Sequence, residues 1–431
     1  MRLHTIALGC QMSAADAAEM AEPLLRRGFS RTDEAEEADA VLISTCTVRQ
    51  HAEHRALSLI GRLLPWKQRD PSRVLIVAGC AAERLGPSLQ RRFPHVDLVV
   101  GSKSVEHFSR IVEESLGERL KALAQTRRPG SRQPSQAFSA TGSRATAFVT
   151  VTRGCNGSCS YCVVPAVRGR ERCRPVDDIL DEVRRRTEGG AREITLLGQA
   201  VNSYSSIRAG RRTAFADLLR LVDAVPGVRR LRFMSPHPGL LDDAMIAAMA
   251  GCPNVCEFLH LPAQSGSDRI LQRMRRGYTR ASYLLGVQKA REAIPGVVFS
   301  TDFIVGFPSE TEEDFSATLE LLRQLKPASA FCFKYSPREP SESASWADDV
   351  PPQVKEDRLR RLNEAVEALT QEALRRQSGR TVEVLTEQAS FGRTRDGFKV
   401  RWKTPAAVGE LVKVPVTGAS RRTLLGEAHE H

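Results

Sequence analysis

Three cysteines within eight residues place the strongest constraint on this chain. Cys155, Cys159 and Cys162 have the spacing C-x3-C-x2-C, directly after an apolar strand pattern at Ala147–Thr152. Thiols this close in sequence can all face one small inorganic group from a single loop, and cysteine thiolates are the usual ligands of iron–sulfur clusters. Three ligands on a four-iron cube leave one iron open for a substrate. Zinc would need a fourth nearby ligand, and buried or disulfide-bonded thiols are seldom spaced so densely.

Three further cysteines end strand patterns in the first 126 residues. The apolar segments that end in cysteine are Ile6–Cys10, Ala40–Cys46 and Val74–Cys80. Helical patterns separate them, which predicts an α/β domain with a parallel sheet, and the carboxyl ends of parallel strands share one edge where ligands bind. We therefore expect Cys10, Cys46 and Cys80 to converge as a second three-thiolate site. The alternative is three independent core thiols.

Strands and helices also alternate after the cysteine loop. Residues 127–146, rich in Arg, Ser, Gly and Pro, indicate a linker, and strand patterns follow the loop at Glu193–Gln199, Arg230–Ser235, Glu257–Pro262, Val297–Pro308 and Phe331–Arg338. Together with the strand before the loop they predict a partial (β/α)6 TIM-like barrel over residues 147–370, with its chemistry at the carboxyl ends of the strands. Polar candidates at those ends are Gln199, Asn202, Ser235, His237, His260, Gln264, Asp302 and Arg338.

Two arginines follow the loop closely. Arg168 and Arg170 would balance thiolate charge or hold an anionic substrate near the Cys155–Cys162 loop, or else be solvated. The four other cysteines are interpreted as structural thiols: Cys173, Cys252, Cys256 and Cys332.

The C-terminal part changes from helical to strand periodicity. Pro351–Gln377 is a charged amphipathic helix pattern, and the short period-two segments of residues 378–431 predict a small β-barrel. Basic and aromatic side chains interleave there, which suits phosphate contact and base stacking on RNA; they are Arg393, Arg395, Lys399, Arg401 and Lys403 with Phe391, Phe398 and Trp402. The alternative is a barrel with a solvated basic face.

Composition narrows the setting. The formal net charge of +12 favours a polyanionic partner such as nucleic acid. Ten cysteines without a secretory signal favour a reducing, cytoplasmic location, and no apolar stretch of 18 residues predicts a membrane span.

These motifs together resemble the radical-SAM methylthiotransferase family over nearly the whole chain. The resemblance rests on Gly9–Met12, Ser44–Arg49, Val77–Cys80, Cys155–Cys162 with Val163–Pro165, Arg168–Glu171, Leu197–Gln199 with Asn202–Tyr204, His260–Gly266 and Thr301–Pro308. It implies that residues 1–126 form the methylthiotransferase N-terminal domain and residues 378–431 an RNA-binding TRAM barrel.

The resemblance also implies the cofactors and partners. One [4Fe-4S] cluster on Cys155, Cys159 and Cys162 would bind S-adenosylmethionine and reduce it to a radical, and a second on Cys10, Cys46 and Cys80 would carry the sulfur, so that C–H becomes C–S–CH3. The residues expected to bind the cofactor are Tyr161, Gln199, Asn202, Ser235, Gln264 and Asp302. The expected partners are the anticodon stem-loop of tRNA and an electron donor such as flavodoxin or ferredoxin, with the enzyme a monomer.

Three branches share this architecture, and the motifs look most like the one that modifies isopentenyladenosine in tRNA. The others modify threonylcarbamoyladenosine in tRNA and an aspartate of a ribosomal protein. Cys173, Ala166 and Ala200 depart from the residues common in the favoured branch. Competing hypotheses are a non-catalytic iron–sulfur RNA-binding protein and a radical-SAM methyltransferase without sulfur insertion, for which the N-terminal cysteines would be unnecessary.

Overall fold

The chain divides into two compact units. The computed structural model describes residues 1–48, 50–126 and 143–427. Unit 1 consists of residues 1–142 and Val163–Arg170, and unit 2 consists of Ser143–Cys162 and the remainder of the chain from Glu171. The segment directly after the cysteine loop therefore folds with the N-terminal part of the chain. Of the expected linker, residues 127–146, only residues 143–146 are among those that the structure describes. No helix of the described ranges is long and apolar enough to cross a membrane.

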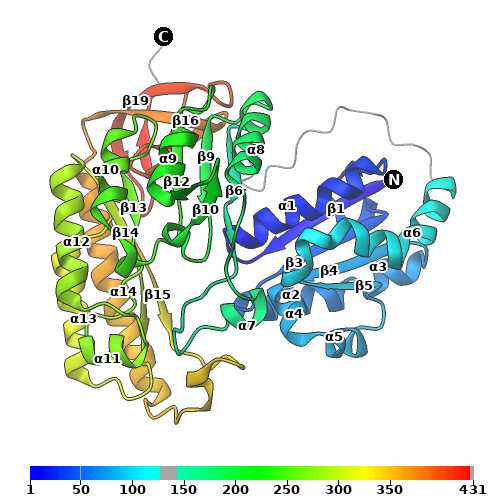
Figure 1. Ribbon diagram of the computed structural model, residues 1–431, viewed down its shortest axis with the longest axis horizontal. Coiled ribbons are helices and arrows are strands. Elements are labelled where there is room, and N and C mark those ends of the chain that lie inside the picture. Colours follow the sequence, from blue (N-terminus) through cyan, green and yellow to red (C-terminus); the bar gives the residue numbers. More distant parts are fainter. Residues whose placement is uncertain (49, 127–142, 428–431) are drawn as a thin grey trace. The chain divides into compact units, whose positions relative to one another are not determined.

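Unit 1 is the expected α/β domain: a parallel sheet with helices on both faces (Figure 1). The strand order is β2-β1-β3-β4-β5, with β1 Arg2–Leu8, β2 Ser30–Arg31, β3 Ala40–Thr45, β4 Val74–Gly79 and β5 Leu98–Gly101. Helices α1 (Gln11–Arg26) and α6 (Phe108–Thr126) share one apolar core with the sheet, and α2 (Gln50–Arg62), α3 (Leu64–Arg69) and α5 (Pro87–Arg92) share the other. The short helix α4 (Cys80–Leu85) also contributes Ala82 to this second core, and α7 (Val164–Arg168) is a further short helix.

Burial on both faces explains why the central strands of unit 1 are continuous apolar runs. Every residue of β3 and β4 is buried. A parallel strand covered by helices on both sides has no solvent face, so it needs no polar alternation. Both strands stop one residue before their cysteine, which leaves each thiol just past the carboxyl edge of the sheet.

Unit 2 contains the expected six-stranded partial barrel. Its parallel strands form two sheets in the orders β12-β9-β6 and β13-β14-β15, and a parallel bridge between Leu231 and Val255 connects β12 to the segment before β13. The strands are β6 Thr146–Thr150, β9 Glu193–Leu197, β12 Arg230–Phe233, β13 Phe258–His260, β14 Val298–Val305 and β15 Ser329–Lys334. The accompanying helices are α8 Val176–Glu188, α9 Phe215–Asp223, α10 Asp243–Gly251, α11 Asp268–Arg273, α12 Arg280–Ala293, α13 Glu312–Leu325 and α14 Pro352–Arg375.

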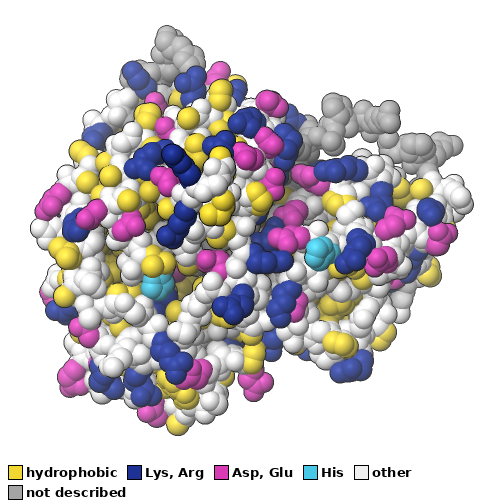
Figure 2. Space-filling view, viewed as in Figure 1, with side chains coloured by type: hydrophobic (Ala, Val, Ile, Leu, Met, Phe, Trp, Pro, Cys, Tyr) yellow, Lys and Arg dark blue, Asp and Glu magenta, His cyan; other side chains and the backbone are white. Residues whose placement is uncertain are grey.

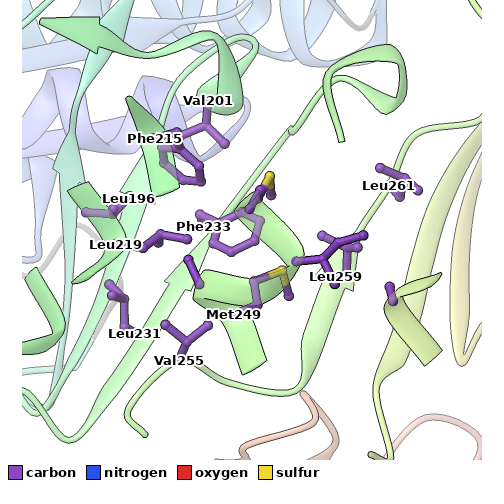
Figure 3. Packing of buried hydrophobic residues seen from close by; sticks show 14 of the residues in the cluster. Leu196, Val201, Phe215, Leu219, Leu231, Phe233, Met249, Val255, Leu259 and Leu261 are labelled. Carbon is purple, nitrogen blue, oxygen red and sulfur yellow. The ribbon is translucent and has the colours of Figure 1, made fainter. Parts of the chain in front are cut away.

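One large hydrophobic core joins the strands and helices of this barrel (Figure 3). Phe215 of α9 meets Phe233 of β12 edge to face, with ring centroids 5.3 Å apart. Leu196, Leu231 and Leu259 come from three successive strands and are fully buried. The core is therefore closed by side chains from β9, β12 and β13.

Two small antiparallel elements in unit 2 were not expected from the sequence. A hairpin joins β10 (Ser205–Arg208) to β11 (Arg211–Ala214), and β7 (Thr152–Arg153) pairs with β8 (Arg172–Cys173). The β7–β8 pair brackets the cysteine loop, since β7 precedes the loop and β8 begins just after the chain returns from unit 1. This pairing thereby fixes both ends of the segment between β7 and β8, which contains the cysteine loop and residues 163–170.

The C-terminal residues close into the expected β-barrel. Its order is β16-β17-β18-β20-β19, with β16 Thr381–Gln388, β17 Phe391–Thr394, β18 Lys399–Trp402, β19 Leu411–Ala419 and β20 Leu424–Gly426. Arg232 of β12 donates to the backbone oxygens of Thr394 and Arg395, and Arg395 pairs with Glu257 before β13. The barrel is thus attached to the end of the central sheet where its strands begin, opposite the expected chemistry.

The sequence-based prediction of an RNA-binding surface on the C-terminal barrel is partly wrong. Phe398 and Trp402 are buried in the core of the C-terminal barrel, so neither ring is available to stack on a base. Arg395 is engaged with Glu257. The period-two pattern of β18 points alternate residues inward, which leaves Lys399 and Arg401 exposed on its outer face.

Surface charges are mixed. Lys and Arg side chains are interspersed with Asp and Glu over the face shown in Figure 2. This face therefore shows no region of a single charge sign.

Candidate active site

Unit 1 brings its three strand-end cysteines together. Cys10 follows β1 and stands at the N-terminal end of α1, Cys46 follows β3, and Cys80 opens α4 after β4. Cys46 and Cys80 are buried, whereas Cys10 is exposed as a residue although protein surrounds its thiol group. The Cys10 and Cys46 thiols are hydrogen-bonded to one another, and each also interacts electrostatically with Cys80. The three thiols therefore lie close enough to interact, and their role as a shared three-thiolate site stays a prediction.

Two glycines allow the cysteine-bearing strand ends to approach. A Cβ at Gly9 would collide with the Cβ of Cys46, and a Cβ at Gly79 would collide with the backbone of Thr45. Gly79 also has φ +101°, a conformation that L side chains rarely adopt. A glycine in front of Cys10 and of Cys80 is thus a geometric requirement for close contact with β3.

The thiols of this set differ in their tendency to ionise. Hydrogen bonding to Cys46 lowers the pKa of Cys10 to about 6, against the opposing effect of burial, and Arg168 and the backbone N–H of Ser13 in α1 assist. The same hydrogen bond raises the pKa of Cys46, and burial raises the pKa of Cys80. One thiolate therefore forms readily, and the others need a positive partner to share their charge.

Arg168 supplies a positive charge at this site. Its Nε donates to the Sγ of Cys80 at 3.2 Å, and its Nη2 donates to Oδ2 of Asp16 at 2.7 Å. Burial alone would lower the pKa of Arg168, but Asp16 with Cys80 and Cys10 more than offsets this, so the pKa is raised. The expectation that Arg168 acts at the Cys155–Cys162 loop is wrong, since α7 carries it into unit 1. Arg170 is exposed.

Unit 2 holds the second cysteine set in a single loop. The N–H of Gly157 donates to the Sγ of Cys155 at 3.2 Å, and a Cβ at Gly157 would lie 3.2 Å from that sulfur and 3.9 Å from the Sγ of Cys159. The sulfurs of Cys155 and Cys159 thus flank a backbone position that carries no side chain. Ser160 anchors the loop, because its Oγ donates to Arg273 O at 2.8 Å.

An arginine again contacts a thiol here. Arg276, which is buried, donates from Nη1 to the Sγ of Cys159 at 3.3 Å and from Nε to Tyr278 Oη at 3.1 Å. Tyr278 donates in turn to Ala263 O at 2.8 Å. Arg276 is 117 positions from Cys159 in the sequence, so no local motif could have indicated this contact. The expected site residue Tyr161 packs edge to face on Phe307, with centroids 6.4 Å apart.

Two expected site residues, one after β9 and one within β14, have buried side-chain acceptors without a partner in the described part of the chain. These acceptors are Oε1 of Gln199 and Oδ1 of Asp302. The other carboxylate oxygen of Asp302 lies 3.6 Å from Nε2 of His260, whose Nδ1 is 2.8 Å from Ser300 Oγ. A buried acceptor without a donor is costly, so these two oxygens are suited to a ligand that brings N–H or O–H groups.

Two others sit in strained backbone. Ser235 has φ +61° in the loop after β12, and Gln264 has φ +69° in the loop after β13. Non-glycine residues in this region cluster at functional sites, because surrounding structure must enforce the conformation. Both residues are among those expected to bind the cofactor, which stays a prediction.

Asn202 holds the backbone of a neighbouring loop through its side chain. Its side chain accepts from His237 N at 2.7 Å and donates to His237 O at 3.0 Å, so it braces the loop after β12. Burial lowers the pKa of His237 to about 4, with Arg276 assisting, which keeps the ring neutral near pH 7. Arg338, after β15, is half-buried.

Of the four remaining cysteines, Cys252 and Cys256 are buried and Cys173 and Cys332 are half-buried. Burial raises the pKa of Cys173, Cys252 and Cys256, and raises that of Cys332 to about 12. None of them joins either three-cysteine set.

The donor sets fit iron–sulfur clusters. No group of three or more His, Cys, Asp or Glu side chains within residues 1–48, 50–126 and 143–427 is arranged to hold a single metal ion. The cysteines of a cubane cluster bind different irons, so such a set need not meet at one metal ion. Each set also has a buried arginine on one sulfur, which suits a group of negative charge.

Two sequence profiles match the chain. The radical SAM superfamily matches residues 149–322, and Uncharacterized protein family UPF0004 matches residues 2–101. The first spans most of the partial barrel, and the second spans β1 to β5 with all three N-terminal cysteines.

Curated relatives match over nearly their whole length. A protein of Desulfitobacterium hafniense (strain Y51) is 41% identical over 99% of this chain and 97% of its own. One of Porphyromonas gingivalis (strain ATCC BAA-308 / W83) is 42% identical over 100% of this chain and 95% of its own. Both are named tRNA-2-methylthio-N(6)-dimethylallyladenosine synthase.

Solved structures share the fold at low identity. The radical S-adenosylmethionine methyltransferase TsrM from Kitasatospora setae is 16% identical, with a TM-score of 0.55 over 77% of this chain and 72% of its own. The cobalamin-dependent S-adenosylmethionine radical enzyme OxsB is 12% identical, with a TM-score of 0.50 over 85% of this chain and 56% of its own.

A six-stranded partial barrel with a C-x3-C-x2-C loop beside its first strand defines the class: this is a radical-SAM enzyme. With relatives above 40% identity over almost its full length, the chain belongs to the family of tRNA-2-methylthio-N(6)-dimethylallyladenosine synthases. It is a radical-SAM methylthiotransferase, and its cofactors are [4Fe-4S] clusters and S-adenosylmethionine.

Proposed function

We propose that this enzyme converts N6-isopentenyladenosine, the dimethylallyl nucleoside beside the anticodon of tRNA, into its 2-methylthio derivative, using two S-adenosylmethionine molecules per turnover. The observation that carries this substrate is the 41–42% identity to relatives whose names specify that product. Two separate three-cysteine sets support the reaction type, because a methyltransferase without sulfur insertion has no need of Cys10, Cys46 and Cys80.

We propose the following roles for the residues at the site. Cys155, Cys159 and Cys162 hold one cluster, and Cys10, Cys46 and Cys80 hold the other. When bound, the clusters and S-adenosylmethionine supply the radical and sulfur chemistry that replaces C–H by C–S–CH3.

The protein's part at the barrel is to bind and orient the cofactor. The unsatisfied oxygens of Gln199 and Asp302 accept hydrogen bonds from S-adenosylmethionine. Tyr161, Ser235 and Gln264 line its site, and Asn202 acts through the loop that it braces.

The partners follow from the same proposal. The substrate is the anticodon stem-loop of tRNA, and the exposed Lys399 and Arg401 of the C-terminal barrel, the latter 5.8 Å from the ring of Phe391, contact its phosphates. A flavodoxin or ferredoxin delivers electrons to a monomeric enzyme in the cytoplasm. We assign residues 1–126 to the methylthiotransferase domain, 127–146 to a linker, 147–370 to the radical-SAM core and 378–431 to the TRAM domain.

The test is mass spectrometry of tRNA nucleosides from cells that lack the gene, with and without its restoration. Loss of the methylthio nucleoside and accumulation of isopentenyladenosine, both reversed by the intact gene, are expected. If the threonylcarbamoyl nucleoside lost its methylthio group instead, the reaction type would stand and the substrate would be wrong.

The purified protein separates enzyme from binding protein. We expect it to release 5′-deoxyadenosine from S-adenosylmethionine under reducing conditions. A non-catalytic iron–sulfur RNA-binding protein would bind tRNA and release none.

A further inference from the structure

The segment Val163–Arg170 delivers a buried cation to the cysteine site of unit 1. Val163 and Val167 pack against Cys80, and Ser102 Oγ donates to Val167 O at 2.6 Å. Apolar contacts and a buried hydrogen bond thus hold helix α7 up to the position before its last residue. That residue is Arg168, whose side chain is only 5% exposed.

The guanidinium group is divided between a carboxylate and a sulfur. Nη2 donates to Asp16, whose side chain is 0% exposed, and Nε donates to Cys80. A structural ion pair would direct the fork of Arg168 at both carboxylate oxygens, since that geometry is the strongest. A second N–H of the same guanidinium, at Nε, faces the thiol of Cys80, a placement that suits a sulfur of negative charge.

We propose that Arg168 is a positioning residue for the cluster on Cys10, Cys46 and Cys80. It orients the sulfur of Cys80 and offsets thiolate charge, which strengthens cluster binding and makes the bound cluster easier to reduce. The inference rests on the proposed function, in that it takes these three cysteines as cluster ligands. Hydrogen bonds to cluster sulfurs and local charge both set the reduction potential of such groups, and residues that orient ligands typically contribute about 10- to 100-fold in metal affinity.

The experiment uses the full chain with Cys155, Cys159 and Cys162 changed to Ala, so that only the unit 1 cluster is reconstituted. In this parent we compare Arg168→Gln, which removes the charge, with Arg168→Lys, which keeps it. The matched control is Arg170→Gln, an exposed arginine two positions further on. The measurements are iron and sulfide per chain, the rate of cluster loss to a chelator, and the reduction potential by EPR-monitored titration.

We expect Arg168→Gln to lose its cluster to the chelator about 10- to 100-fold faster than the parent and to show a more negative potential. Arg168→Lys should stay near the parent in potential while losing the cluster several-fold faster, because an ammonium retains the charge but not the planar fork. Arg170→Gln should match the parent in every measurement.

A neutral pair separates this role from simple folding. Arg168→Gln alone leaves Asp16 buried without its cation, which destabilises the fold whatever happens at the cluster. Asp16→Asn combined with Arg168→Gln should return the apoprotein's melting temperature toward the parent, yet keep the negative shift in potential and the fast cluster loss.

Two results would overturn the proposal and distinguish its failure from that of the proposed function. If the double variant regained the parent's potential and chelator resistance, Arg168 would be only the ion-pair partner of Asp16. If the parent itself bound no cluster, the inference and the assignment of Cys10, Cys46 and Cys80 would fall together.

Discussion

The two three-cysteine sets are assembled differently in the two units. In unit 2, Cys155, Cys159 and Cys162 share one loop, and the sulfurs of Cys155 and Cys159 flank Gly157 within it. In unit 1, the thiols come from the ends of three strands and converge only when the parallel sheet has formed. The unit 2 site therefore depends on the conformation of one loop, whereas the unit 1 site depends on the folded sheet. Damage to the sheet should therefore affect the two sites unequally.

The two sites nevertheless share one device. A buried arginine donates to one sulfur of each set, Arg168 to Cys80 and Arg276 to Cys159. Both arginines are distant in sequence from the thiol they contact. The common need is a fixed positive charge beside a group that gathers thiolates.

Removing one ligand from each site gives the sharpest separation. Cys159→Ala should abolish both 5′-deoxyadenosine release and thiolation, whereas Cys46→Ala should abolish thiolation and leave 5′-deoxyadenosine release near that of the unmodified enzyme. Both products are measured in one reducing assay with tRNA and S-adenosylmethionine. Full thiolation by Cys46→Ala would remove the chemical distinction between the sites.

The glycines test whether fold and loop respond differently. Gly9→Ala should prevent cluster loading in unit 1, because the added Cβ meets the Cβ of Cys46 between two fixed strand ends. Gly157→Ala should retain about half or more of the iron in unit 2, because an exposed loop can yield to a contact at 3.2 Å. Iron is counted in chains that keep only one cysteine set. Equal losses would contradict the comparison.

Arg276 allows the shared device to be tested in unit 2. Arg276→Gln should make the cluster on Cys155, Cys159 and Cys162 about 10-fold more sensitive to a chelator, since Cys159 loses a charged donor and Tyr278 loses a partner. Arg275→Gln is the control, because its side chain is 52% exposed and pairs with Glu342. The unit 1 cluster should be unaffected in both variants.

The smallest expected effect concerns pH and unit 2 alone. Because the pKa of His237 falls from 6.5 to about 4 on folding, the unfolded chain binds more protons between these values, so stability rises with pH across that window and is lost as pH falls. His237→Asn should flatten this slope. Urea unfolding at several pH values measures it, with Trp66→Phe in the background so that fluorescence reports Trp346 and Trp402 of unit 2. An unchanged slope would assign the effect to another group.

Features set by residues close together in the sequence are predictable in this protein, whereas contacts between distant segments are not. The loop cysteines and the strands that carry Cys46 and Cys80 follow from local spacing and apolar runs, and the topological rule for parallel sheets was enough to join the N-terminal thiols. The C-terminal barrel was also expected, but periodicity alone did not decide which of its faces points inward. Phe398 and Trp402 were therefore assigned to RNA although they fill the core.

Contacts made through side chains from distant segments were not predictable. Arg276 has no motif around it that points to Cys159. Arg168 was singled out but placed at the nearer cysteines, since proximity in sequence favours Cys162 and only the fold of α7 carries the residue to Cys80. The bracing of His237 by Asn202 likewise depends on two loops that follow different strands.

The excursion of residues 163–170 has a consequence for how such a protein can be divided. A fragment that ends at residue 126 would contain every strand of the first sheet but would lack α7, so Cys80 and Asp16 would face water where Arg168 and Val167 belong. A fragment that begins at residue 143 would carry Val163 and Val167 with nothing to cover them. Recombination between residues 126 and 143 would thus separate each part from side chains that it needs. The two parts are therefore expected to be exchanged between genes only together.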